Sequence, residues 1–593
     1  MYPAFKYLPL RDEQQEIRLL SLEPGRECDP LVLEIRHASL QTPSTKARPR
    51  PTVGELQETL PKGWTVCETD GPSRQFLFEH EDTDTTSWTH PDPSFSPESY
   101  APRDELPPPQ FEPNYEALSY AWGSTEDARE TVSIRYATLA PVAAGFSSIT
   151  LGNNLATALR HLRYRDRPRT LWIDALCINQ GNLAERERQV RRMADIYQLA
   201  RRVLMWLGPA CADSTLAIST LSYLGAQVVV SLDHVRFRSP SATEPEWYHS
   251  SHLLPYSPET WASLLAFVRR TWFERLWVWQ EAALSNSQAA VVCGHDQTPW
   301  HQIRVACICL FAKQTLPQPA LRERLHSLRT VTTAISSQTV YQILYYVRDR
   351  LCADPRDKVY GVLGIASPGF TAKILPQYSQ PVQEVYKDAF LAYLDLTRRL
   401  DLFTLSNLAD RSMLTEAMPS WVPNLSNELL AWPVQAFQFA TGISCSQWQH
   451  SGNLLTLTGT QAAVIHQVAV PAPSGFKERA LHLATWEPEN AADTLYSPPL
   501  ASRTTQETLL DAFLKTIRVN FLGERWPTVV GQSLQDWKQI YRGMVSSTEP
   551  PEATLSDACV YWCLKFVGGR TVATTVEGYI GLVPSAALPG TSL

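Results

Sequence analysis

Apolar positions recur at helical spacing through one aromatic stretch near the middle of the chain, residues 270–285, which reads RTWFERLWVWQEAALS. Its apolar stripe consists of Phe273, Leu276, Trp277 and Leu284. The remaining faces are also apolar, which predicts a helix buried on all sides. Glu281 lies in this stripe one turn after Trp277. Because burial disfavours its charge, we expect Glu281 either to pair with Arg275 or Arg270 or to have a chemical task.

Shorter apolar runs predict the strands of a sheet. LWIDALCI at 171–178 and VLMWLG at 203–208 have the length of buried strands, and helical spacing fills the segment between them. Asn182, with Glu185 three residues later, predicts the start of that helix and a capping box. This strand–helix–strand order is typical of a parallel βαβ unit, whose ligands bind at the carboxyl ends of the strands.

The flanking segments continue the alternation of strands and helices. Two short strands are expected within residues 1–40, and a further strand at 289–294. The Ser-Pro pair at 257–258 predicts the start of another helix. Beyond residue 300 the pattern is mainly helical, and strands return at 453–468 and 569–584.

A separate antiparallel module is expected near residue 75. Trp64 and Trp88 stand 24 positions apart, with alternating strand-like runs between them and Pro91 three residues after the second. This pattern resembles a WW domain, a three-stranded module that binds proline-rich peptides. The resemblance implies that Trp64 and Pro91 form its core. The residues that it places on the peptide-binding face are Phe76, Phe78, His80, Thr86 and Trp88.

Two features of this module leave its role open. Phe76 stands where the family usually has Tyr, and the loop from His80 to Trp88 is one residue longer than the common pattern. The alternatives are peptide binding and a purely structural module. In the Pro-rich linker that follows, Pro108–Phe111 approximates a proline-proline-any-tyrosine ligand. We expect this segment either to occupy the module's groove or to act as a stiff spacer.

Four motifs point to a larger family. The motifs are YEALSYAWG at 115–123, LWIDALCINQ at 171–180, ERERQVRRMADIYQLARRVLMWLG at 185–208 and RTWFERLWVWQE at 270–281. In this order they resemble the heterokaryon incompatibility (HET) domain of filamentous fungi. The resemblance implies an α/β domain that signals cell death on self/non-self recognition and that self-associates. Relatives usually continue for another pair of strands after YIGLVPSAAL, so we expect either an open sheet edge there or a sequence that ends early.

The resemblances divide the chain into six parts. We expect opening strands of the HET region at 1–48, an inserted WW domain at 58–93, a Pro-rich linker at 94–113, the HET domain at 114–295, a mostly helical HET-associated region at 296–450, and a mixed α+β C-terminal region at 451–593.

A more distant resemblance suggests chemistry. The HET motifs are similar to segments of the TIR domain, which implies a TIR-like parallel sheet and places Glu281 where TIR enzymes carry the carboxylate that cleaves NAD. The same comparison implies substrate-binding roles for Trp122, Gly123, Asp174 and Trp277. The alternatives are a core aromatic role for Trp122 and a capping or salt-bridging role for Asp174.

The overall composition limits the remaining functions. A formal charge of −7 argues against a general binder of nucleic acid or lipid surfaces. The 11 cysteines are scattered without a zinc-like pattern, and phosphate-loop, dinucleotide, metalloprotease and serine-hydrolase motifs are missing, so we predict no metal and no bound cofactor. Without a signal peptide or a membrane-length apolar run, we expect a cytoplasmic protein.

The two family resemblances leave two hypotheses for the function. The chain is either a signalling module without chemistry or a hydrolase with NAD as its substrate.

Overall fold

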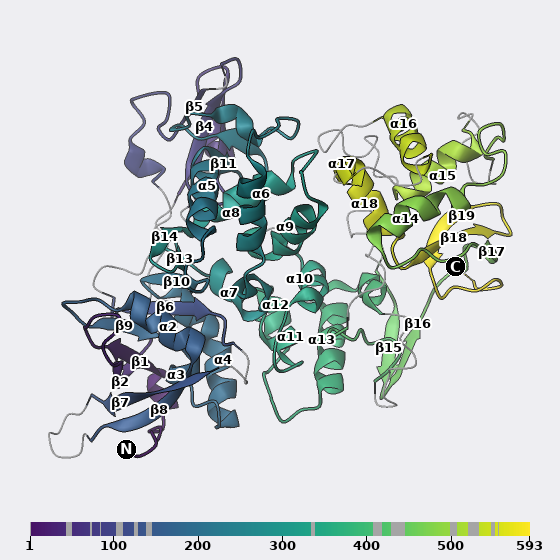
Figure 1. Ribbon diagram of the computed structural model, residues 1–593. Coiled ribbons are helices and arrows are strands. Elements are labelled where there is room, and N and C mark those ends of the chain that lie inside the picture. The colour runs from purple at the N-terminus through teal and green to yellow at the C-terminus, as the bar shows by residue number, and fades with distance from the viewer. Residues whose placement is uncertain are drawn as a thin grey trace. The chain divides into compact units, whose positions relative to one another are not determined.

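The computed structural model describes residues 2–42, 50–71, 74–83, 85–101, 111–123, 128–137, 145–333, 338–406, 418–427, 445–497, 507–519, 533–546, 552–555 and 557–592. The chain divides into two compact units. The first contains residues 1–311 and 323–380, and the second contains residues 312–322 and 381–593. The first unit carries the largest sheet, whose strands are purple to teal in Figure 1.

The main sheet of the first unit has nine strands in the order β14-β13-β10-β6-β9-β1-β2-β7-β8. The strands are β1 Glu16–Leu22, β2 Val32–Ser39, β6 Glu116–Tyr120, β7 Arg129–Tyr136, β8 Ser147–Gly152, β9 Arg169–Trp172, β10 Arg202–Trp206, β13 Ala290–Cys293 and β14 Asp296–Pro299. The central strands β13, β10, β6 and β9 pair in parallel, and so do β2 and β7. The pairs β9–β1, β1–β2, β7–β8 and β13–β14 are antiparallel. The sheet is therefore mixed, and the expected parallel arrangement accounts for only part of it.

Helices pack beside this sheet, and several begin where the sequence predicts. The helices before residue 381 are α1 Val53–Gln57, α2 Asn153–Leu162, α3 Asp174–Cys177, α4 Leu183–Gln198, α5 Ser214–Ala226, α6 Pro258–Val268, α7 Trp277–Ala283, α8 Trp300–Phe311, α9 Pro319–Thr332, α10 Val340–Tyr346, α11 Asp357–Tyr360 and α12 Pro368–Thr371. The side chains of Asn182 and Ser257 cap α4 and α6 as expected. No described helix combines the length and the apolar character that a membrane crossing needs.

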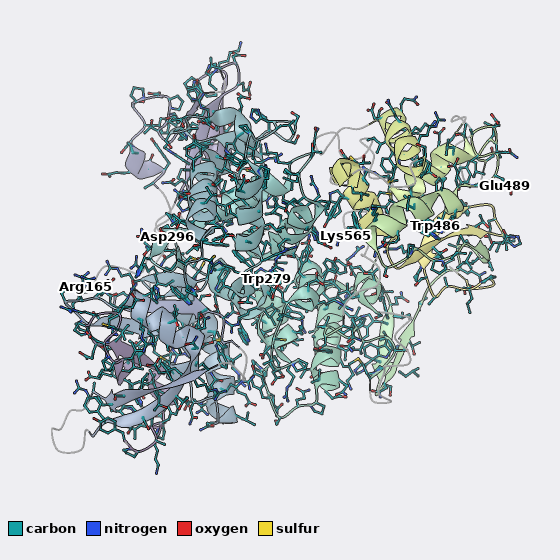
Figure 2. The ribbon with its side chains drawn as sticks, in the orientation of Figure 1. Arg165, Trp279, Asp296, Trp486, Glu489 and Lys565 are labelled. Atoms are coloured by element: carbon teal, nitrogen blue, oxygen red, sulfur yellow. The ribbon has the colours of Figure 1, made fainter. Side chains whose placement is uncertain are left out.

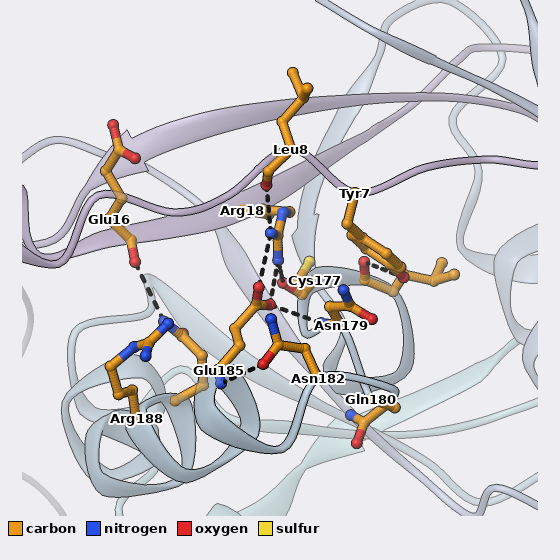
Figure 3. A network of polar contacts seen from close by, with 12 residues as sticks. Tyr7, Leu8, Glu16, Arg18, Cys177, Asn179, Gln180, Asn182, Glu185 and Arg188 are labelled. Carbon is orange, nitrogen blue, oxygen red and sulfur yellow. Dashed lines mark hydrogen bonds and ion pairs between the residues drawn. The ribbon is translucent and has the colours of Figure 1, made fainter.

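The predicted capping box at α4 is only half formed, because Glu185 has a stronger partner. Asn182 accepts a hydrogen bond from the Glu185 backbone N–H at 3.2 Å. The Glu185 carboxylate instead pairs with Arg18, which is fully buried in β1, at 2.5 Å (Figure 3). Arg18 also donates to the Cys177 carbonyl, and Glu185 accepts from the Asn179 N–H. This network joins the opening strands to the turn between α3 and α4.

Two apolar runs form different elements from those expected. The run at 171–178 leaves the sheet at Trp172 and turns into the short helix α3. The single helix predicted at 270–285 is wrong: a 3₁₀ turn, Thr271–Glu274, is followed by extended backbone at Arg275 and then by α7. The break arises because Arg275 bridges to Leu351, and its guanidinium donates to the Tyr120 carbonyl. The aromatic positions before and after Arg275 therefore do not form one stripe.

The predicted three-stranded antiparallel sheet is present as β3 Trp64–Glu68, β4 Phe76–His80 and β5 Thr85–Ser87. One side packs in its own core of buried residues, Leu56, Val66, Phe76, Phe78 and Tyr100. Trp64 packs edge-on against His80 with ring centroids 5.3 Å apart. The expected contact between Trp64 and Pro91 stays a prediction.

This small sheet is joined to the rest of the first unit through the hairpin β11 Val228–Val230 and β12 Arg236–Arg238. The Asp70 N–H donates to the Val230 carbonyl at 2.7 Å, and the Thr86 hydroxyl donates to the Arg238 carbonyl at 2.9 Å. Asp70 also forms a buried ion pair with Arg304 of α8. Two hydrogen bonds to backbone carbonyls and one buried ion pair therefore hold the small sheet against the rest of the first unit.

The second unit combines helices with small antiparallel sheets. The elements are α13 Val382–Thr397, β15 Trp448–Ser451, β16 Leu454–Leu457, β17 Ile465–Val468, α14 Phe476–His482, α15 Leu509–Ile517, α16 Leu534–Val545, α17 Glu552–Leu555, α18 Ala558–Val567, β18 Arg570–Thr575 and β19 Ile580–Pro584. Strands therefore return at 453–468 and 569–584 as predicted. Trp537 and Phe513 are fully buried in its helical core.

We expect Asp70→Ala to destabilise the chain because it leaves the Arg304 guanidinium buried without its countercharge. Loss of one partner from a buried pair costs about 3–5 kcal/mol, whereas an exposed substitution changes stability by about 0.5 kcal/mol or less. Urea unfolding of the full chain measures this difference, with the exposed Asp82→Ala as the matched control. Equal unfolding midpoints for the two variants would contradict a structural role for the ion pair.

Candidate functional site

The loop after β6 is held in place by one asparagine at the start of α2. Asn154 Nδ2 donates to the Ala121 carbonyl at 2.6 Å, and its Oδ1 accepts from Trp206 Nε1 at 2.9 Å. The side chain thus joins the loop after β6 to the last residue of β10. Gly123 follows with a φ of +82°, a conformation that L side chains rarely adopt. The loop therefore leaves the sheet in a defined direction.

Trp122 and Asp174 come together at the carboxyl ends of the neighbouring strands β6 and β9. Trp122 Nε1 donates to Asp174 Oδ2 at 2.8 Å, while Asp174 Oδ1 accepts from the Ala175 N–H at 2.7 Å. Trp122 is 43% exposed, whereas Asp174 is buried. Burial raises the pKa of Asp174, while Arg275 and the two hydrogen bonds lower it. The pair presents an accessible aromatic surface beside a buried carboxyl group.

Glu281 lies in the interior next to this pair. It is 1% exposed and lies in the first unit on α7, the helix that carries Trp279, which is labelled in Figure 2. Burial raises the pKa of Glu281 to about 7, the Asp174 charge raises it further, and Arg275 lowers it. Among the described residues Glu281 has no ion pair within 4.0 Å, and its Oε2 has no hydrogen-bond partner. The predicted direct salt bridge to Arg275 or Arg270 is therefore wrong.

The two arginines named for that role have other contacts. Arg270 donates to the carbonyls of Leu207 and Pro209 at 3.0 and 3.1 Å. Arg275 donates to the Tyr120 carbonyl at the end of β6, and from there its charge acts on both carboxyl groups. Arg275 therefore lowers the pKa of Glu281 by electrostatic attraction at a distance, without an ion pair or hydrogen bond between the two side chains.

Two hydroxyl groups complete the surroundings of Glu281, and sequence analysis missed both. The hydroxyls of Ser119 and Tyr197 lower its pKa by hydrogen bonding. Ser119 Oγ accepts from Trp272 Nε1 at 2.8 Å, which leaves the Ser119 hydroxyl proton for Glu281. Ser119 is the one polar residue among apolar positions in the interior of β6, and that signal could have identified it.

Trp277, the last of the predicted substrate-binding residues, hydrogen-bonds to a carboxylate other than Asp174 and Glu281. Trp277 Nε1 donates to Asp357 Oδ2 at 3.1 Å, and Asp357 also accepts from the Tyr378 hydroxyl at 2.6 Å. Burial raises the pKa of Asp357 to about 6. The structure thus brings Trp122, Asp174 and Glu281 together and places Trp277 against a different carboxylate.

The five predicted peptide-binding residues differ in accessibility. Phe76 and Phe78 are buried in the core of the small sheet, and Arg50 covers the Phe76 ring at 3.8 Å. Thr86 is buried, His80 is half-buried, and Trp88 is 37% exposed. Most of the proposed ligand segment, residues 108–110, lies outside the described residues.

A cavity of about 520 Å³ lies at the amino-terminal ends of the central strands, whereas Glu281 lies near their carboxyl ends. It is lined by the first residues of β6, β9 and β10, namely Glu116, Arg169 and Arg202. Glu116 accepts from both arginines at 2.5 Å, which lowers its pKa despite burial. Glu116 is therefore engaged by Arg169 and Arg202, while Arg36, Arg167 and Arg201 also line the cavity. We place the candidate chemistry at the carboxyl ends of the strands, where Trp122, Asp174 and Glu281 meet.

We expect Glu281→Gln to change how stability depends on pH. The pKa of Glu281 is raised from 4.5 to about 7, so between these pH values the folded chain keeps a proton that the unfolded chain loses. This proton contributes on the order of 3 kcal/mol to the free energy of unfolding. The contribution is complete below pH 4.5 and is lost as the pH rises through about 7. Unfolding at pH 5 and pH 8 should show that Glu281→Gln gains stability relative to the unsubstituted chain at the higher pH. The exposed Glu58→Gln should show no such gain, and parallel behaviour of all three proteins would refute the shift.

Comparison with known proteins places this site within a recognised domain type. Residues 115–281 match the family model described as "Heterokaryon incompatibility protein (HET)". The chain is also similar to "Heterokaryon incompatibility protein 6, OR allele" of Neurospora crassa, with 28% identity over 372 residues that cover 54% of each chain. The chain thus spans about half the length of this curated relative. No solved structure matches. The matched segment runs from the residue before β6 to Glu281 itself, and these findings support its identification as a HET domain.

Proposed function

We propose that this chain is a fungal incompatibility protein that triggers cell death on non-self recognition. The observation that carries the proposal is the HET match over residues 115–281, together with the similarity to an incompatibility protein of Neurospora crassa. Self-association of the HET domain and a cytoplasmic location belong to the same proposal. The described helices, which lack a membrane-spanning candidate, are compatible with it.

A second candidate function, NAD hydrolysis, is favoured by the surroundings of Glu281. A carboxyl group with a pKa of about 7 exchanges its proton near neutral pH, which suits general acid–base work. In its ionised form it could also stabilise the positive charge that develops on a ribose as nicotinamide leaves. The exposed Trp122 indole beside Asp174 offers a surface on which a planar ring can stack. Because Glu281 is 1% exposed, substrate contact requires the covering side chains to move.

Expression of Glu281→Gln in a filamentous fungus tests both functions together. If Glu281 acts chemically, this variant should abolish nicotinamide release and cell death while its protein level stays normal. Glu58→Gln, which is exposed and remote from the site, should retain both activities. Normal killing by a well-folded Glu281→Gln chain would exclude the catalytic role and leave signalling without chemistry. Absence of killing by the unsubstituted chain would count against the signalling proposal.

We further propose that the small sheet binds proline-rich peptides through its accessible edge. Trp88 and the half-buried His80 are the accessible members of the predicted set, and an exposed Trp is the kind of side chain on which a polyproline II helix packs. Phe76 and Phe78 would support this edge from within the core.

Trp88→Ala should weaken binding of a proline-proline-any-tyrosine peptide to the full chain at least tenfold, measured by fluorescence anisotropy. Leu481→Ala, at an equally exposed position of the second unit, serves as the control and should bind normally. Phe111→Ala should strengthen binding if the linker occupies the same groove in cis. Identical affinities for the unsubstituted and Trp88→Ala chains would rule out this edge as the binding surface.

A further inference from the structure

Three potential metal ligands converge on the first unit outside the site of Glu281. They are Glu27 in the loop between β1 and β2, His161 in the last turn of α2, and His295 in the turn between β13 and β14. Their ligand atoms all lie within 4.8 Å of one another. His161 Nε2 and His295 Nε2 are each 3.6 Å from a different oxygen of Glu27.

These separations suit a tetrahedral ion. Zinc binds nitrogen and carboxylate oxygen at about 2.0–2.1 Å, so two ligands of a tetrahedral site are separated by about 3.3 Å. Each histidine nitrogen is 3.6 Å from one Glu27 oxygen, within a few tenths of an ångström of that value, and the whole ligand set lies within 4.8 Å. Small side-chain rotations of the exposed Glu27 and His295 would bring all three ligand atoms to it. Two imidazoles and one carboxylate are also a donor set that zinc and related divalent transition metals accept.

The His161 ring is already held in the orientation that a metal requires. His161 Nδ1 lies 2.9 Å from the Thr157 carbonyl, which can only accept a hydrogen bond. Nδ1 therefore carries the proton, and the Nε2 lone pair faces Glu27 and His295. The ring packs against Trp206 with centroids 5.1 Å apart, and the side chain is 12% exposed. Such a backbone partner is the usual outer support of a metal-binding histidine.

The segments that carry the other two ligands are anchored independently. Arg163 donates to the carbonyls of Asp29 and Pro30 at 2.8 and 3.0 Å, which fixes the loop of Glu27. Next to His295, Asp296 accepts from the Thr215 hydroxyl at 2.7 Å, and Figure 2 labels Asp296 beside β13 and β14. Neither anchor uses a ligand atom.

The local charge balance also leaves Glu27 available. Arg160 of α2 is attracted by the Glu27 charge but forms its ion pair with Glu130, at 2.6 Å. Glu27 is 54% exposed and His295 is 75% exposed, so their mutual contacts contribute little without an ion, since exposed pairs are worth about 0–1 kcal/mol.

We propose that Glu27, His161 and His295 form a binding site for one divalent transition metal, with zinc as the best match. The fourth position is open to water, because three protein ligands are present. The ion joins a loop, a helix end and a hairpin that are far apart in the sequence. It stabilises the folded chain by mass action, because the unfolded chain does not hold the three ligands together.

Metal titration of the full chain tests the site. The unsubstituted protein should bind one more equivalent of Co²⁺ and Zn²⁺ than His295→Ala or His161→Ala, and Glu27→Gln should bind at least tenfold more weakly. His450→Ala, an exposed histidine of the second unit, is the matched control and should bind like the unsubstituted chain. Zn²⁺ should raise the unfolding temperature of the unsubstituted and control chains by more than that of the three site variants.

Two outcomes would overturn the proposal. One is equal stoichiometry in the unsubstituted and His295→Ala chains, a readable comparison because His295 is exposed and its loss leaves the core untouched. The other is thiolate-to-cobalt absorption that accounts for all bound Co²⁺, since the 11 cysteines would then be the ligands. Absorption typical of tetrahedral nitrogen and oxygen ligation, lost in His161→Ala, would support the site.

Discussion

The ion pair between Arg18 and Glu185 is the constraint on which the first unit depends. The two residues are 167 positions apart, and Arg18 is fully buried, so the strand β1 cannot keep its place in the sheet without its partner. Glu185 in turn fixes the Asn179 N–H, and Arg18 fixes the Cys177 carbonyl. These contacts set the turn that follows α3, the helix that begins with Asp174. The opening strands thus determine where the candidate site lies.

Within that site, the carboxyl groups of Asp174 and Glu281 have different hydrogen-bonding surroundings. Asp174 receives hydrogen bonds from Trp122 and from the Ala175 N–H, whereas Glu281 keeps one oxygen without a partner. A proton on Glu281 therefore removes the charge repulsion between the two carboxyl groups. Pairs of acids with unequal environments are the arrangement from which enzymes build acid–base chemistry. The same inequality also serves a purely structural purpose, because a protonated Glu281 is inexpensive to bury.

Local patterns predicted the elements that depend on local physics. The apolar runs that became β10 and β13, and the caps at Asn182 and Ser257, follow from neighbouring residues alone. Glu281 and Asp174 were identified, but only a family resemblance connected them. The helix break at Arg275 could not be predicted, because its cause is Leu351, far along the chain. The convergence of Glu27, His161 and His295 was likewise beyond sequence analysis, since the three segments share no spacing rule.

The docking of the small sheet through Asp70 and Arg304 has a thermodynamic consequence. Because the sheet is tied to β11 and α8 by bonds that can open, its docked and released forms are two states of one equilibrium. A ligand that binds the docked form more tightly must favour docking by the same factor by which docking favours the ligand. Occupancy at the edge of β4 and β5 is then communicated to α8, in the body of the first unit, without any contact between the ligand and that helix.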